Sequence, residues 1–212
     1  MDIFGVPVNI WHGLVVEEHS GIMVLILVTL AVRVLADIWY RGKVATPRVE
    51  GIRGASDTIA YVGAFACTVF LLLSGITGYL SVPYSSLVAQ PVYLDKSLLA
   101  LGALYFWAVF CFERYWFGPG VWKQKGLYLV YLLTAVLGFI FTMLAASVGA
   151  ELTLGESALE PVYTALNFSW YKFSLQPVDI EITLALVVVG VVVALVALLR
   201  GPKSKTAPNK TA

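Results

Sequence analysis

Five long apolar stretches, separated by polar segments, dominate the pattern of this 212-residue chain. A helix needs roughly 20 residues to cross the hydrocarbon core of a membrane, and each stretch is close to this length. The pattern therefore predicts an all-α membrane protein. We place the five expected transmembrane helices at about residues 20–40, 57–80, 95–117, 126–150 and 180–199.

The five expected spans differ in which faces carry small or polar residues. The last span is apolar all round, which is typical of a helix that faces lipid. The first four carry small or polar faces, and small residues let membrane helices approach closely. We therefore expect an antiparallel four-helix bundle with a fifth, peripheral transmembrane helix. The expected division is an interfacial N-terminal segment at 1–18, the bundle at 19–150, an acidic and aromatic outer loop at 151–179, the fifth helix at 180–200 and a disordered tail at 201–212.

One basic connection, residues 41–56, is expected to lie between the first two spans. Pro47 is expected to break any helix there, because proline lacks the backbone N–H that a helix interior needs. Ser56 followed by Asp57 is a helix-start signal, so the second span is expected to begin at Asp57.

The charged residues predict how the chain is threaded through the membrane. Net charge is only +1, yet twelve of the fourteen basic residues fall on the side that holds the 41–56 connection. Basic residues collect on the cytoplasmic side of membrane proteins. Five spans then place the N-terminus outside and the C-terminus in the cytoplasm. A composition of 59% hydrophobic and 13% charged residues also fits a multi-pass membrane protein in contact with the lipid bilayer.

A polar group is expected at the outer ends of the spans. It comprises His12, His19, Asp95 and Glu151. Imidazole and carboxylate are both ligands of divalent transition metals, so one interpretation is a metal site. Two helical turns separate the histidines, about 10 Å by helix rise, which is too far to share one ion. The other interpretation is that hydrated polar residues cap the helix ends.

A b-type haem between the helices is a second possible cofactor. Membrane cytochromes hold such a haem with axial histidines or a methionine. Spans two to five contain no histidine, so Met23 and Met143 are the other candidate axial ligands. Of these, Met143 is the one that is able to pair with His19 across the bundle. Ordinary packing is the alternative role of Met143.

A charge cluster is expected at the inner face. It comprises Arg33, Asp37, Asp57, Glu113 and Arg114. Arg33 and Asp37 are four residues apart, so they are able to pair on one helix. Charges inside a membrane are costly and usually face a bundle interior or a partner. The cluster is therefore either a proton or quinone site or a set of ion pairs that clamps the helices.

Three short segments are similar to motifs of a known family: Glu18-His19-Ser20-Gly21, Asp95-Lys96-Ser97-Leu98-Leu99 and Val148-Gly149-Ala150-Glu151-Leu152. Through them, residues 12–155 resemble a family of small prokaryotic four-helix membrane proteins of unknown function. The resemblance implies that this chain lies in a prokaryotic-type plasma membrane. Members of that family carry further histidines at the start of the third span and after the fourth. Here Lys96 stands at the first of these places and no histidine at the second. If those histidines bind haem or metal in relatives, the resemblance implies that this chain has lost most of that site.

The sequence contains no phosphate-binding glycine loop, catalytic triad, Cys/His metal cluster or nucleic-acid-binding patch. We therefore expect an accessory subunit of a larger membrane complex, such as a respiratory or redox complex, with other membrane subunits as partners and no catalytic activity of its own. One alternative is an electron-transfer subunit that binds b-haem or a metal through His19. A small solute transporter is the second alternative.

Overall fold

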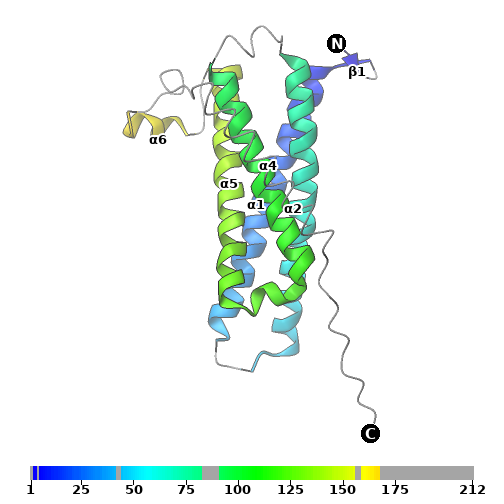
Figure 1. The fold of residues 1–212 in the computed structure, drawn as a ribbon, viewed down its shortest axis with the longest axis vertical. Helices are drawn as coiled ribbons and strands as arrows, with labels where there is room; N and C mark the ends of the chain where they lie inside the picture. The colour runs from blue at the N-terminus through cyan, green and yellow to red at the C-terminus, as the bar shows by residue number, and fades with distance from the viewer. Residues whose placement is uncertain (1, 4, 42–43, 83–90, 156–158, 168–212) are drawn as a thin grey trace. The chain divides into compact units, whose positions relative to one another are not determined.

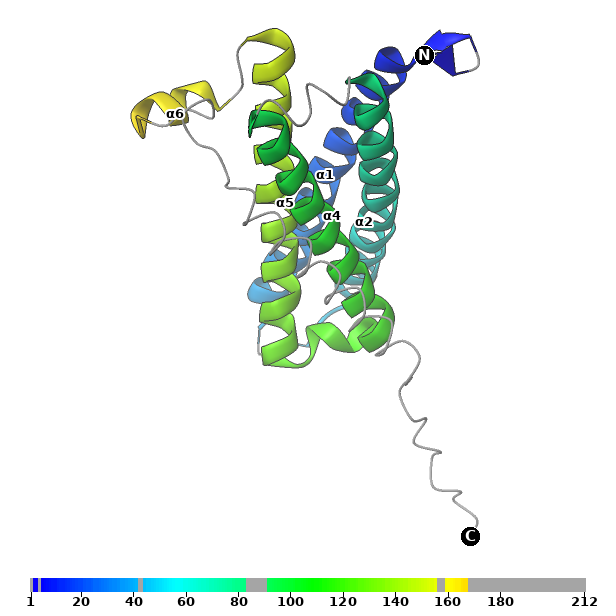
Figure 2. The ribbon, with the colours of Figure 1, turned by 45° about the horizontal axis from the view of Figure 1, so that its top comes forward.

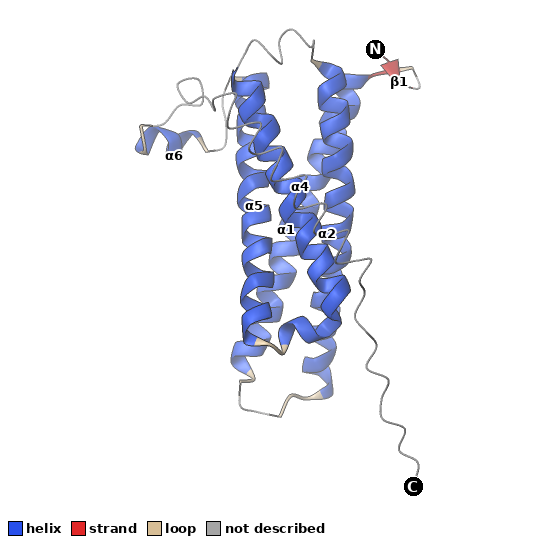
Figure 3. Ribbon diagram, viewed as in Figure 1, coloured by secondary structure: helices blue, strands red, loops and turns tan. Residues whose placement is uncertain are grey.

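A computed structural model describes the chain except for residues 1, 4, 42–43, 83–90, 156–158 and 168–212. Of the described residues, 89% are helical (Figure 3). They form five α-helices: α1 (Val8–Trp39), α2 (Pro47–Ser81), α4 (Pro91–Phe117), α5 (Lys125–Leu154) and α6 (Glu160–Ala165). A short 3₁₀ helix, η1 (Gly118–Trp122), joins α4 to α5. Two short strands, β1 (Asp2–Ile3) and β2 (Val6–Pro7), pair with each other before α1.

Four of these helices are long and apolar enough to cross a membrane, which indicates a multi-pass membrane protein. Figures 1 and 2 show α1, α2, α4 and α5 lying side by side. Large apolar side chains such as Val24, Phe65 and Leu129 are exposed on their outer surfaces. That surface suits lipid, because a helix apolar on its outside faces a hydrocarbon solvent. The expected fifth span at 180–200 and the tail at 201–212 lie outside the described residues.

The core of the four helices is built from large aromatic side chains fitted against small residues. Trp107 and Phe110 of α4 and Tyr131 of α5 are fully buried, and the rings of Phe110 and Tyr131 stack at 4.1 Å. A Cβ placed at Gly138 would lie 3.0 Å from Trp107, so this glycine makes room for the indole. The Trp107 Nε1 donates to Thr142 Oγ1 at 3.0 Å, which satisfies the one polar atom of that ring.

Small residues on α2 also bring that helix close to α1. A Cβ at Gly63 would lie 3.0 Å from Ile26, and one at Gly78 would lie 3.0 Å from the His12 ring. The prediction that small residues of the second span allow close helix approach is confirmed at these two positions. Gly75 differs, because the space where its Cβ would stand is open.

The helices begin earlier than the sequence pattern predicts. Helix α1 begins at Val8, within the segment 1–18 that was expected to be interfacial, and continues without a break into the first span. Pro47 does not break a helix but occupies the first turn of α2. The N–H that proline lacks has no intrahelical partner in a first turn, and its φ angle already suits a helix. Ser56 and Asp57 consequently lie inside α2 and do not start it.

The described part of the 151–179 connection contains the end of α5 and the short helix α6. Helix α5 ends at Leu154 and is capped by Gly155 in the left-handed conformation at φ 77°, which glycine adopts without steric cost. Tyr163 of α6 is buried, and its hydroxyl donates to Ser147 Oγ of α5 at 2.6 Å. This contact holds α6 against α5.

Candidate functional site

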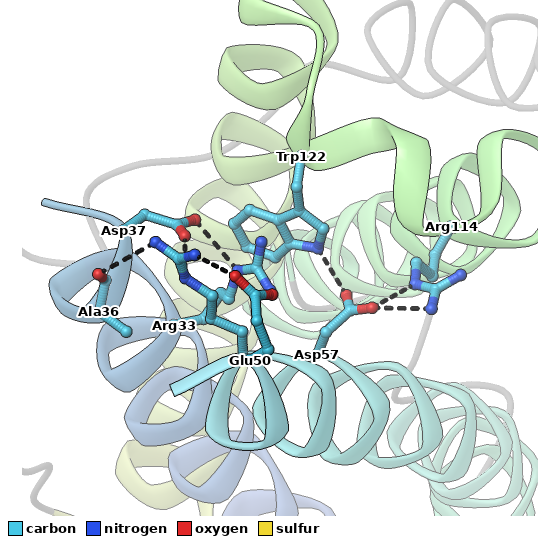
Figure 4. A network of polar contacts seen from close by, with 8 residues as sticks. Arg33, Ala36, Asp37, Glu50, Asp57, Arg114 and Trp122 are labelled. Atoms are coloured by element: carbon cyan, nitrogen blue, oxygen red, sulfur yellow. Dashed lines mark hydrogen bonds and ion pairs between the residues drawn. The ribbon is translucent and has the colours of Figure 1, made fainter. Parts of the chain in front are cut away.

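The charged residues near the C-terminus of α1 and the N-terminus of α2 form two linked networks. Arg33 and Asp37 lie four residues apart on α1, and Glu50 and Arg53 lie three apart on α2. Both spacings place side chains on one face of a helix. Arg114 comes from the last turn of α4 and Trp122 ends η1. Four elements therefore converge on this end of the molecule (Figure 4).

Asp57 is the centre of the first network. Arg114 Nε donates to Asp57 Oδ2 at 2.8 Å, and Arg114 Nη2 lies 2.7 Å from the same oxygen. Trp122 Nε1 donates to the other oxygen, Oδ1, at 2.7 Å. The Asp57 side chain is only 5% exposed, so its charge depends on these two partners for compensation. Figure 4 shows the carboxylate between the two side chains, where it joins α2 to α4 and η1.

Asp37 is the centre of the second network, which joins α1 to α2. Arg33 Nε lies 3.0 Å from Asp37 Oδ2, and Arg53 Nε lies 2.8 Å from Oδ1. The pairing of Arg33 with Asp37 predicted from their spacing is thus confirmed. Arg53 also pairs with Glu50 Oε1 at 2.6 Å and donates from Nη2 to the Ala36 carbonyl at 3.3 Å.

Trp122 connects the two networks. The Arg33 guanidinium carbon lies 4.7 Å from the centre of the Trp122 ring, at a distance typical of a cation–π contact. The same indole donates its N–H to Asp57. A single side chain of η1 therefore contacts a cation of one network with its face and the anion of the other with its edge.

An open cavity of about 960 Å³ lies among these residues. Its apolar and aromatic lining includes Ile38, Pro119, Trp122, Tyr128 and Leu129. Five basic side chains line it, against three acidic ones, so its lining is cationic. The charged lining residues are Arg33, Arg41, Arg53, Arg114 and Lys123 on the basic side, and Asp37, Glu50 and Asp57 on the acidic side.

Glu113, the fifth member of the expected inner cluster, does not line this cavity. It is buried between α4 and α5, where Thr134 Oγ1 donates to its Oε2 at 2.9 Å. The other four expected residues all line the cavity. Sequence reasoning did not include Glu50, Arg53 or Trp122 in the site. The three-residue spacing of Glu50 and Arg53 was an available signal, whereas nothing local marks Trp122.

The two histidines are engaged by different partners. His12 Nδ1 lies 3.2 Å from Thr77 Oγ1 of α2, so the start of α1 contacts the end of α2. His19 is buried, and its Nδ1 lies 3.0 Å from the Val15 carbonyl oxygen of its own helix. Their spacing of two turns thus does not bring them to a common partner.

The four residues expected as a metal site are not gathered into one group. Asp95 is fully buried on α4, and Glu151 is partly buried near the end of α5. Within the described ranges, no three or more His, Cys, Asp and Glu side chains lie close enough together to hold a metal ion. A metal at His12, His19, Asp95 and Glu151 is therefore not supported by the arrangement of these side chains.

The expected haem pair, His19 and Met143, lies on α1 and α5. Met143 is partly buried and packs against the central apolar cluster, to which Met23 also belongs. The Val15 contact fixes His19 Nδ1, which is a common way to orient a histidine whose other nitrogen binds a metal. The same contact is also an ordinary way to satisfy a buried histidine within a helix, so ligation by His19 and Met143 stays a prediction.

Comparison with known proteins finds no family model, curated protein or solved structure that matches this chain.

Proposed function

We propose that this chain is an accessory subunit of a larger complex in a prokaryotic-type plasma membrane, with its N-terminus outside and its C-terminus in the cytoplasm. The proposal includes an antiparallel bundle of α1, α2, α4 and α5, and a fifth transmembrane helix at residues 180–200. The contact of His12 with Thr77 joins the start of α1 to the end of α2. The ion pair of Asp37 with Arg53 joins the end of α1 to the start of α2. Both contacts support an antiparallel arrangement.

The basic residues at the cavity end support the proposed orientation. Cytoplasmic segments of membrane proteins carry an excess of lysine and arginine. Arg41 and Lys123 line the cavity, and the exposed Arg48 lies at the start of α2 close by in the sequence. We therefore assign the cavity end to the cytoplasmic side, and the end with α6 to the outside.

Cysteine labelling tests this orientation. We expect a membrane-impermeant maleimide to label Glu160→Cys in intact cells and Arg48→Cys only after permeabilisation. Both native residues are exposed, so neither replacement disturbs the core. The wild-type chain is the background control, because Cys67 is buried and Cys111 partly buried in the bundle. Labelling of Arg48→Cys in intact cells and of Glu160→Cys only after permeabilisation would reverse the proposed topology.

A groove on α1 is the observation that carries the proposal of an accessory subunit. It has a volume of about 290 Å³ and is lined by Glu18, Gly21, Ile22 and Leu25. This i, i+3, i+4, i+7 spacing is the pattern with which one helix face meets another helix. The space where a Cβ of Gly21 would stand is open, so a partner helix has room for close backbone approach.

The polar side chains described above further support a structural role. Asp57, Asp37 and Glu113 are each held by partners from another helix or from η1. Carboxylates engaged in this way fix helices to one another, even where they line the cavity as Asp37 and Asp57 do. The structure therefore favours a scaffold for partners over an enzyme centred on these carboxylates.

Filling the groove tests the proposal. We expect wild-type protein from native membranes in mild detergent to migrate on a native gel with partner subunits, and Gly21→Leu to migrate at the mass of the single chain. Leucine suits a helix better than glycine by up to about 1 kcal/mol, so the substituted chain itself should remain folded. Ala31→Leu is the matched control, since it enlarges another exposed small residue of α1 outside the groove and should leave the complex intact.

Two results would count against this function. Wild-type protein that already migrates as a single chain in mild detergent would remove the need for partners. A sharp b-type band in the reduced-minus-oxidised spectrum, lost in His19→Ala, would instead support the alternative of an electron carrier.

A further inference from the structure

The cavity at the cytoplasmic end holds more positive charge than its own carboxylates neutralise. Asp57 is paired with Arg114, Asp37 with Arg33 and Arg53, and Glu50 with Arg53. Arg41 and Lys123 are exposed at the cavity, and neither forms an ion pair with another described residue. Two cationic side chains are thus left to face whatever occupies the cavity.

Arg33 adds a third, oriented cation. Its Nε contacts Asp37 at 3.0 Å, and its guanidinium lies 4.7 Å from the centre of the Trp122 ring. These two contacts fix the plane of the group. Within the described residues, its two terminal nitrogens donate no hydrogen bond. Planar N–H groups held in this way suit phosphate oxygens, which guanidinium binds in a bidentate manner.

We propose that this cavity binds a phosphate group, with Arg33, Arg41 and Lys123 as its cationic partners. The phosphate belongs either to the headgroup of an anionic membrane lipid or to a soluble phosphate. The lining favours the lipid, because the apolar residues Ile38, Pro119 and Leu129 line the same cavity as the cations. A volume of about 960 Å³ also exceeds what a lone phosphate ion occupies. Basic pockets between membrane helices on the cytoplasmic side are known to bind lipid headgroups.

Lipid titration of the purified full-length chain tests this proposal. Native mass spectrometry would measure binding of short-chain phosphatidylglycerol, of zwitterionic phosphatidylcholine and of inorganic phosphate. We expect phosphatidylglycerol to bind at least about tenfold more tightly than phosphatidylcholine, since each basic residue near an anionic headgroup adds roughly a factor of five. The double variant Arg41→Gln/Lys123→Gln should abolish this preference and leave the ion pairs within the fold unchanged.

Arg48→Gln is the matched control. Arg48 is an exposed arginine of the first turn of α2 that does not line the cavity. This variant should bind phosphatidylglycerol like the wild type. The alternative ligand is inorganic phosphate. In that case it should bind with the same dependence on Arg41 and Lys123, and phosphatidylglycerol should bind no more tightly than inorganic phosphate does. This result would support the phosphate site with a soluble phosphate as its ligand.

Two outcomes would overturn the proposal. One is an equal affinity for phosphatidylglycerol and phosphatidylcholine together with no binding of inorganic phosphate. The other is an equal loss of affinity in Arg48→Gln and in the double variant, which would indicate general attraction of basic residues to anionic lipid. Lipid binding is measured on a single chain, which contains the whole cavity and needs no partner subunit. Neither outcome therefore tests the proposed function as an accessory subunit.

Discussion

Replacing Asp57 by asparagine is expected to lower the free energy of unfolding by about 3–5 kcal/mol, because a buried charge is left without its partner. The Arg114 side chain is only 15% exposed, and Asp57 is its one ion-pair partner among the described residues. The amide of asparagine offers no charge to the guanidinium. Unfolding by SDS in mixed micelles, followed by tryptophan fluorescence, measures the change.

Glu50→Gln is the control for the Asp57 variant. Glu50 also pairs with an arginine, but its side chain is 59% exposed, and exposed ion pairs contribute about 1 kcal/mol or less. The double variant Asp57→Asn/Arg114→Met should be more stable than Asp57→Asn alone, because no unpaired charge then remains. An Asp57→Asn protein as stable as Glu50→Gln would show that water, and not Arg114, compensates this carboxylate.

Gly102→Ala is expected to destabilise the protein by about 1–3 kcal/mol through overpacking between α4 and α5. A Cβ at Gly102 would clash with Phe141 Cδ1 and would lie 2.6 Å from Cε1, so the aromatic ring has to move. That ring packs against Phe106 at 5.3 Å and borders the central apolar cluster, which limits where it can go. The same SDS titration measures the loss.

Gly75→Ala is expected to change the stability in the opposite direction, that is, to stabilise the protein. The space beside Gly75 on α2 is open, so alanine should stabilise this helix by about 0.5–1 kcal/mol. Adding Phe141→Leu to Gly102→Ala should recover part of the lost stability, because the ring atoms that clash are removed. Stabilisation by both glycine-to-alanine variants would contradict the close contact of α4 with α5 at Gly102.

The existence of the four helices was predictable, because a helix that crosses a membrane needs a long apolar run whatever its neighbours are. Their ends were less predictable. Pro47 was expected to break a helix, but the rule applies to helix interiors and Pro47 stands in a first turn. Ser56 and Asp57 form a short-range start signal, which carries no information on whether the helix already exists ten residues earlier.

In the cavity, contacts within one helix were predictable from the sequence, and contacts between distant segments were not. The pair of Arg33 and Asp37 follows from helix geometry alone and was predicted. The partners of Asp57 lie 57 and 65 residues further along the chain, so its role depends on how α4 and η1 pack against α2. Trp122 carries no local signal, because its position between Arg33 and Asp57 arises only when η1 turns the chain back.

The two polar contacts between α1 and α2 are about as far apart as the two headgroup layers of a bilayer. His12 meets Thr77 at one end, and Asp37 meets Arg53 at the other. At 1.5 Å per residue, these contacts lie about 37 Å apart along α1. This distance falls between the hydrocarbon core of about 30 Å and the full bilayer of about 40–45 Å, so an α1 that stands along the membrane normal would place both contacts in the headgroup layers. A much thicker bilayer would draw the Asp37 ion pairs into hydrocarbon, and the protein should therefore partition into thinner membranes or tilt in thicker ones.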